Sequence, residues 1–236
     1  MSCGVVLVLG SGPSANRAAD WPRAPFTQIV AINNAWRVRP DWDFLIHPDD
    51  FPPEQQPATP SASQSIIRSD AYVPIQNGYG GFVYAGGTMS FTAGYWALGA
   101  LKPRVLAYFG CDMVYPDTGP THFYGTGTPD PLRKDISLRS LEAKSARLML
   151  LAAAQGCACV NLSDDESRLV FPRATLDTVA TLRPITPPPL TAALAEEARL
   201  GYIVASGKYW KEESRFDPAA VDALDQLWFS TLKAAP

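Results

Sequence analysis

A strand that runs directly into a glycine-rich turn constrains this chain more than any other feature. Residues 5–9 read VVLVL, and the next five residues are Gly10, Ser11, Gly12, Pro13 and Ser14. A continuous apolar run indicates a strand buried on both faces, as in a parallel sheet. The glycines permit a sharp turn, and Ser14 can cap a following helix. The stretch therefore predicts a strand–turn–helix unit at the start of an α/β fold.

Such a turn can bind an anion, because free N–H groups and the helix dipole point at one spot. We interpret it as the phosphate or ribose end of a nucleotide pocket. The competing interpretation is a plain turn between strand and helix, in which glycine and serine are common. The third glycine of G-x-G-x-x-G is missing, and Asn33 and Asn34 replace the acidic residue that NAD requires. The G-x-x-x-x-G-K-[ST] motif of P-loop NTPases does not occur.

Composition narrows the class of protein. The chain has 236 residues and a formal net charge of −3, which gives no electrostatic basis for binding a nucleic acid polymer or an anionic membrane. No apolar run approaches the ~20 residues of a membrane span, and no signal peptide pattern begins the chain. Cys157 and Cys159 are expected on one face of a strand, as free thiols in a cytoplasmic protein.

Strand and helix patterns alternate along the chain. Further strands are expected at 28–32, 42–46, 71–75, 105–109 and 157–162, and helices after Ser14, at 89–102 and at 137–154. Alternation predicts a Rossmann-like three-layer α/β sandwich with a mainly parallel sheet. We expect this domain to span 1–177. Residues 178–236 are expected to form a linker and two helices, 190–200 and 218–232, that pack on the domain, cover the site or join a homo-oligomer.

Loops connect several of these elements. Residues 51–65 and 116–131 are expected to be loops, and the glycine-rich segment 77–88 a flap over a pocket or a wide turn.

The predicted strands end in polar residues, and ligands of open parallel sheets bind beyond the carboxyl ends of the strands. Both histidines of the chain follow such strands, and imidazole is a natural general base. His47 comes just after one strand, and His122 lies in a loop near Asp112, Tyr115 and Tyr124. The competing interpretation for each histidine is a structural or surface role.

Carboxylates offer a second kind of chemistry. Asp41 and Asp43 form a D-x-D pattern of the kind that holds a metal in many glycosyltransferases, but they precede their strand. That position favours turn-making or capping carboxylates. Asp49 and Asp50 are better placed for a metal, although no third ligand is identifiable.

Taken together, these motifs resemble those of bacterial sialyltransferases that decorate lipooligosaccharide. The shared order is the GSGPS loop, a strand ending in Asn33, and His47-Pro48. Thr88-Met89-Ser90, GCDM at 110–113, HFYG at 122–125 and NLSDDESRL at 161–169 are similar to later motifs of that family. The resemblance covers roughly residues 4–175. The same skeleton occurs in a broader related group that includes archaeal pterin pyrophosphokinases.

The resemblance implies a CMP-activated sugar donor and transfer without a metal or other cofactor. Carried over by position, Gly10, Ser11, Gly12 and Asn33 would contact the nucleotide, and Ser90 the donor. The predicted nucleotide and donor site also includes Pro13, Ser14, Asn34 and Thr88, with Tyr115 and Tyr124 as candidates for the phosphate.

Two positions depart from the family pattern. Ser11 replaces an asparagine, and Thr126 stands where the family has its catalytic histidine. Threonine cannot act as a base at neutral pH. His122 or His47 would have to take that role, or the reaction differs.

Three hypotheses follow. The first is an inverting glycosyltransferase acting on a cell-surface or capsular glycan, with His122 as general base and Asp112 orienting it or holding the donor. The second is a Mg²⁺-dependent nucleotide phosphoryl or pyrophosphoryl transferase, with Asp49, Asp50 or Asp112 as ligands. The third is a non-catalytic nucleotide-binding protein that kept the fold.

Overall fold

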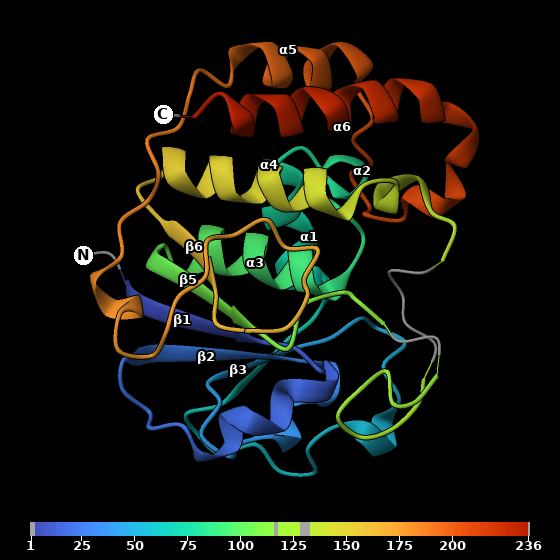
Figure 1. The fold of residues 1–236 in the computed structure, drawn as a ribbon. Coiled ribbons are helices and arrows are strands. Elements are labelled where there is room, and N and C mark those ends of the chain that lie inside the picture. The colour runs from blue at the N-terminus through green and yellow to red at the C-terminus, as the bar shows by residue number, and fades with distance from the viewer. Residues whose placement is uncertain (1–2, 116–117, 128–132, 236) are drawn as a thin grey trace.

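Six parallel strands form one sheet in the order β4-β3-β2-β1-β5-β6 (Figure 1). The computed structural model describes residues 3–115, 118–127 and 133–235. The strands are β1 (Cys3–Leu9), β2 (Phe26–Ile32), β3 (Phe44–Ile46), β4 (Ser65–Ile67), β5 (Pro103–Phe109) and β6 (Ala158–Asn161). The Rossmann-like α/β fold predicted from the sequence is confirmed, and every pairing in the sheet is parallel.

The central strand β1 is buried on both faces, as its continuous apolar run predicts. Val6 and Val8 point to a core shared with α1 (Ser69–Gly78), α3 (Met89–Ala100) and α4 (Leu141–Ala154). Leu7 and Leu9 point to the opposite core, which η1 (Pro13–Asp20) and residues 174–182 cover. Since all strands are parallel, their carboxyl ends share one edge of the sheet.

The C-terminal helices add an outer layer beyond α4 (Figure 1). In this layer α5 (Thr191–Leu200) and α6 (Pro218–Lys233) enclose a third core with α2 (Phe82–Ala85), in which Trp228 is fully buried. Two buried ion pairs join these helices to α4: Arg147 Nε lies 2.6 Å from Glu197 Oε1, and Lys144 Nζ lies 2.7 Å from Asp225 Oδ1. Residues after 177 thus pack on the domain that precedes them.

The helices predicted at 89–102, 137–154, 190–200 and 218–232 are confirmed as α3, α4, α5 and α6 with small shifts of their ends. The strand predicted at 71–75 is wrong, because these residues lie in α1. There Tyr72 and Gln76, four residues apart, both face the protein interior, a spacing that suits a helix. The short edge strand β4 was not expected. None of the described helices is long and apolar enough to cross a membrane.

The predictions for the two cysteines, for Ser14 and for the loop at 116–131 can also be compared with the structure. Cys157 and Cys159 share one face of the sheet, as expected, and are buried free thiols whose pKa values burial raises. Ser14 does not cap a helix, because Gly12 is the N-cap residue of η1, without a side-chain cap, and Pro13 follows it. Of the loop predicted at 116–131, the structure describes residues 118–127, and the rest lies outside the described residues.

Candidate functional site

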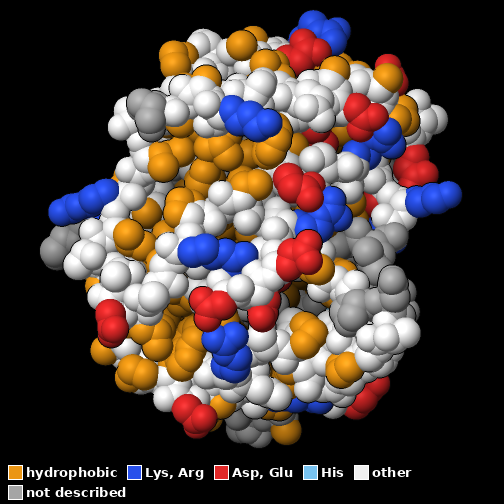
Figure 2. Space-filling model, viewed as in Figure 1, with side chains coloured by type: hydrophobic (Ala, Val, Ile, Leu, Met, Phe, Trp, Pro, Cys, Tyr) orange, Lys and Arg blue, Asp and Glu red, His pale blue; other side chains and the backbone are white. Residues whose placement is uncertain are grey.

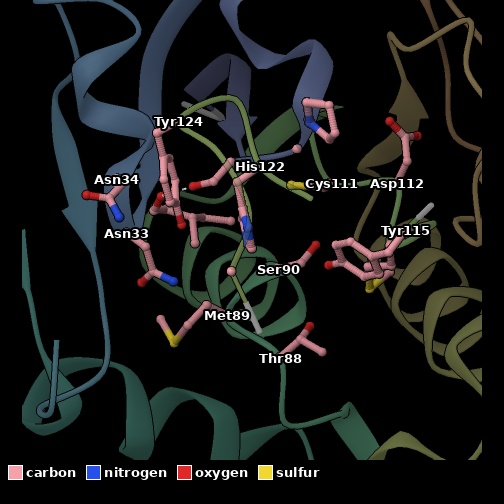
Figure 3. Close-up of a pocket in the computed structure, with 18 of the residues that line it drawn as sticks. Asn33, Asn34, Thr88, Met89, Ser90, Cys111, Asp112, Tyr115, His122 and Tyr124 are labelled. Carbon is pink, nitrogen blue, oxygen red and sulfur yellow. Dashed lines mark hydrogen bonds between the residues drawn. The ribbon is translucent and has the colours of Figure 1, made fainter. Parts of the chain in front are cut away.

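A cavity of about 820 Å³ opens at the carboxyl edge of the sheet. Loops after β1, β2, β3, β5 and β6 line it, together with the N-terminus of α3 and the segment 122–127 (Figure 3). All but one of the predicted site residues line this cavity: Gly10, Ser11, Gly12, Pro13, Ser14, Asn33, Asn34, Thr88, Ser90, Asp112, Tyr115, His122 and Tyr124. The exception is His47. No residue after 177 is among the described lining residues.

The glycine turn after β1 packs against the equivalent turn after β5. A Cβ atom on Gly10 would lie 2.3 Å from the carbonyl oxygen of Gly110, so no other residue fits there without moving backbone. The Gly10 N–H donates to Phe109 O at 2.8 Å, and the Gly12 N–H donates to Gly110 O at 2.8 Å. Gly110 itself has φ +68°, in the left-handed region that favours glycine. These glycines bring two strand ends together.

Ser11 ties the same turn to two further parts of the chain. Its hydroxyl donates to Ile32 O at 3.2 Å, at the end of β2. Its carbonyl accepts the Phe123 N–H at 3.1 Å, which fixes the segment that carries His122. Pro13 has no N–H, and the Gly12 N–H is already used. Most of the turn's polar groups therefore hold the protein together, although the turn lines the cavity.

The N-terminus of α3 uses its polar groups differently. Thr88 Oγ1 accepts the Phe91 N–H at 3.3 Å, and Thr88 O accepts the Thr92 N–H at 3.0 Å. The N–H groups of Met89 and Ser90 are left without an intrahelical partner. Ser90 is 9 % exposed, and its Oγ, beside the Cys111 thiol, has no hydrogen-bond partner of normal geometry among the described residues. Three donors of one 12-residue helix thus face the cavity.

Burial of Cys111 raises its pKa to about 12, and the Ser90 hydroxyl opposes part of that shift. The thiol at the base of the cavity is therefore protonated at neutral pH, and it is not a nucleophile.

The two asparagines after β2 have separate roles. Asn33 has φ +50° and faces the cavity in Figure 3, and its buried Oδ1 has no hydrogen-bond partner among the described residues. Asn34 is 3 % exposed, and its Nδ2 donates to Gln55 Oε1 at 2.7 Å. Asn33 is therefore available to a ligand. Asn34 anchors the chain after β3 through its amide nitrogen, while its own buried Oδ1 also has no hydrogen-bond partner among the described residues.

His122 is held at the cavity by its own loop. Residues His122 and Gly125 exchange two backbone hydrogen bonds, of 2.9 and 3.1 Å. The His122 ring stacks on Tyr124, with centroids 5.0 Å apart and planes 18° apart. Its Nδ1 lies 2.9 Å from the hydroxyl oxygen of Thr121, which also lies 3.1 Å from Gly127 O. Burial lowers the pKa of His122, so the imidazole is neutral at pH 7.

The other two predicted catalytic residues have different surroundings. Asp112 Oδ1 accepts from Asn161 Nδ2 at 2.9 Å and lies 3.9 Å from Arg173 Nη1. These residues, rather than His122, hold the carboxylate. His47 is 1 % exposed, its Nδ1 is hydrogen-bonded to Pro48 O at 2.8 Å, and its ring packs on Phe51. His47 does not line the cavity, and its position fits a structural role.

The charged residues among the described lining are all acidic: Asp50, Asp112, Asp165 and Glu166. Figure 2 shows acidic side chains beside a hollow in this face of the molecule. Asp165 and Glu166 were not predicted, although they follow β6 at the edge where ligands bind. Among the described residues, no three His, Cys, Asp or Glu side chains gather as metal ligands would. The Asp49 carboxylate accepts a hydrogen bond from the Ser69 hydroxyl at 2.6 Å.

The D-x-D residues lie at the opposite edge of the sheet, as their position before β3 indicates. Asp43 Oδ2 accepts from the Ile29 N–H and from Arg23 Nη2, both at 2.6 Å. Asp41 is paired with Arg39, and this hydrogen bond is the main cause of its lowered pKa. Both carboxylates hold turns of the chain.

Comparison with protein-family models, with curated proteins and with solved structures found no match. Function is therefore inferred from the cavity and from the motifs that line it.

Proposed function

We propose that this protein transfers a sugar from a nucleotide-activated, CMP-linked donor to a glycan acceptor. One observation carries the proposal: the His122 imidazole, whose pKa burial lowers, and the N-terminus of α3 line the same cavity (Figure 3). An anionic leaving group and a proton acceptor are the two things that such a transfer requires. Helix N-termini stabilise anions, and a neutral histidine accepts protons near pH 7.

In the proposed complex, the donor phosphate lies at the N-terminus of α3. The Met89 and Ser90 N–H groups and the Ser90 hydroxyl would donate to its oxygens. The orphaned Oδ1 of Asn33 would accept from a ribose hydroxyl or from the base. Because the charged side chains of the described lining are carboxylates, backbone and hydroxyl donors supply the positive end of the site.

The reaction follows from this placement. With the Nδ1 proton donated to Thr121 Oγ1, the Nε2 of His122 carries the lone pair and accepts the proton of the acceptor hydroxyl. That hydroxyl oxygen attacks the anomeric carbon and forms the new glycosidic bond. The bond from the anomeric carbon to the donor phosphate oxygen breaks, and its electron pair leaves on the nucleotide. Attack from the opposite side inverts the anomeric centre.

Replacement of His122 tests the assignment. His122→Ala is expected to lower kcat by about 10²- to 10⁴-fold, the usual contribution of a general base. Its affinity for CMP should stay near that of the wild type. Thr126→Ala, an exposed change in the same loop, is the matched control and should retain activity. Normal sugar transfer by His122→Ala would show that the base is misassigned.

The pH dependence of kcat/KM is a second readout. The neutral form of His122 is the active form, and burial holds the pKa of its imidazole below the ordinary histidine value. Activity should therefore be level through neutral pH and fall only as the pH drops through that lowered pKa. The acid limb should disappear in the residual activity of His122→Ala. A limb centred above the ordinary pKa of histidine would contradict the proposal.

The acidic lining favours one second candidate, a Mg²⁺-dependent nucleotide phosphoryl or pyrophosphoryl transferase. Four carboxylates line the cavity and could hold the ion: Asp50, Asp112, Asp165 and Glu166. Mg²⁺ would supply the positive charge that the described side chains of the lining do not. Loss of all activity in a chelator, with recovery on adding Mg²⁺, would select this candidate over sugar transfer.

Thermal-shift measurements with CMP, UDP, GDP, CMP-sialic acid and ATP, with and without Mg²⁺, would rank the ligands. A ligand that binds the native state raises Tm according to its concentration relative to Kd. Tight binding without turnover of any donor would identify a non-catalytic nucleotide-binding protein.

A further inference from the structure

Tyr209 brings the C-terminal layer into contact with the segment that precedes α3. It lies in the short helix η7 (Tyr209–Lys211), is 3 % exposed, and stacks on Phe82 with ring centroids 6.0 Å apart. Its hydroxyl donates to Asp135 Oδ2 at 2.8 Å and accepts from Arg133 Nη2 at 3.0 Å. The phenol thus joins two distant parts of the chain through buried hydrogen bonds.

The same group of residues holds both polar atoms of Gly87. The Gly87 N–H donates to Ser137 Oγ at 3.0 Å, and Gly87 O accepts from Arg133 Nη2 at 3.3 Å. Ser137 in turn donates to Asp135 Oδ1 at 2.5 Å. A Cβ atom on Gly87 would lie 2.3 Å from the Tyr209 hydroxyl oxygen, so the two residues are packed in close contact.

Gly87 directly precedes Thr88, the N-cap residue of α3. Gly86 has φ +91°, and two adjacent glycines give this stretch little stiffness of its own. Contacts with other parts of the chain must therefore fix the direction in which the N–H groups of Met89 and Ser90 point. Those contacts come from four residues: Arg133, Asp135, Ser137 and Tyr209.

We propose that Tyr209 is a positioning residue, through which the C-terminal layer sets the affinity of the α3 N-terminus for an anionic ligand. The proposal rests on the proposed function in one respect, namely that the donor phosphate binds at this N-terminus. Tyr209 lies outside the lining of the cavity and acts through Ser137, Asp135, Arg133 and Gly87.

Tyr209→Phe tests the inference, because it removes the hydroxyl and keeps the ring. Tyr84→Phe is the matched control: the Tyr84 hydroxyl is also buried and joins the C-terminal layer, through Glu197 O and the Tyr202 N–H, both at 2.8 Å, but it does not reach Gly87. Two quantities are measured on the full chain. They are native-state hydrogen exchange of the Phe91 and Thr92 amides, both of which are hydrogen-bonded to Thr88, and the Kd for CMP by calorimetry.

Tyr209→Phe is expected to speed exchange of the Phe91 and Thr92 amides and to weaken CMP binding, each by about tenfold, which corresponds to about 1.4 kcal/mol. Tyr84→Phe should leave both quantities unchanged at a comparable loss of Tm. Equal exchange of the Phe91 and Thr92 amides in the two variants would overturn the inference, and that readout needs no ligand. If the wild type binds no nucleotide, the proposed function fails while the exchange result still decides the positioning role.

Should Tyr209→Phe fail to fold, Ser137→Ala removes the partner of the Gly87 N–H directly. The same tenfold changes are expected from it. Unchanged exchange of the Phe91 and Thr92 amides in that variant would likewise overturn the inference.

Discussion

Two segments line the cavity next to glycine residues: the turn after β1 and the N-terminus of α3. The polar groups of these two segments have opposite roles. The turn donates its Gly12 N–H to Gly110 O and its Ser11 hydroxyl to Ile32 O. The α3 N-terminus leaves the N–H groups of Met89 and Ser90 without intrahelical partners, and its preceding glycine is held from outside. One segment assembles the edge of the sheet, and the other is available to a ligand.

This difference shows that a glycine motif can have two different structural roles. Glycine permits close backbone approach, but the approaching group can be a ligand or another strand end. In this protein Gly10 and Gly12 meet Gly110. The donors proposed for the ligand come instead from Met89 and Ser90 in the first turn of α3, directly after the N-cap residue Thr88.

The largest effect on stability is expected from a substitution in the turn after β1. Gly10→Ala would place Cβ 2.3 Å from Gly110 O and 2.5 Å from Cys111 Sγ. Relief requires β1 and β5 to separate, so the free energy of unfolding should fall by about 3 kcal/mol, the upper range for overpacking. Gly78→Ala is the control, since a Cβ at that helical position meets nothing within 4 Å and should stabilise slightly. Urea denaturation measures both, and equal stabilities would contradict the packing account.

A second pair of variants compares the two segments directly. Ser90→Ala should weaken CMP binding by about tenfold, because a ligand phosphate loses a buried hydroxyl donor. Ser11→Ala should lower the free energy of unfolding by about 1 kcal/mol through loss of its bond to Ile32 O, with less effect on the Kd. Calorimetry and urea denaturation of both variants separate the roles. The reverse pattern would make the turn the ligand site.

The smallest effect concerns the acidic side chains of the lining. The double variant Asp165→Asn with Glu166→Gln removes two exposed carboxylates from the cavity. An anionic nucleotide should then bind about two- to threefold more tightly at low salt, and the gain should shrink as salt screens the charges. Weaker binding in the presence of Mg²⁺ would instead favour the metal-dependent candidate. Asp164→Asn, exposed but outside the described lining, is the matched control.

Much of the fold could be predicted because the strong patterns are local. The run at 5–9 and the segments that became β2, β5 and α4 carry enough apolar residues to define their elements. The failures occurred where a pattern is short: residues 71–75 contain too few positions to separate a strand from a helix turn, and β4 has only three residues. Which face such a segment buries depends on partners far away in the sequence.

The location of the site was easier to predict than the side chains that take part in it. The rule that ligands bind beyond parallel strands placed Asn33, Asp112 and His122 together at one cavity. It also included His47, whose ring turns into the protein toward Phe51. Side-chain direction after a strand depends on packing, which the sequence does not state. Tyr209 was missed for the same reason, because its hydrogen-bond partners Asp135 and Ser137 lie 74 and 72 residues away in the sequence.

The order of the sheet has a consequence for how the protein folds. Leu9 pairs with Ala31 on one side and with Phe109 on the other, so the second pairing closes a loop of roughly a hundred residues. Closing a long loop costs chain entropy before the new contacts compensate, which makes high contact order slow to form. Because the cavity needs both neighbours of β1 and the loop after β6, it is completed only when the last strand docks. Binding of the proposed nucleotide would therefore report that the whole sheet has assembled.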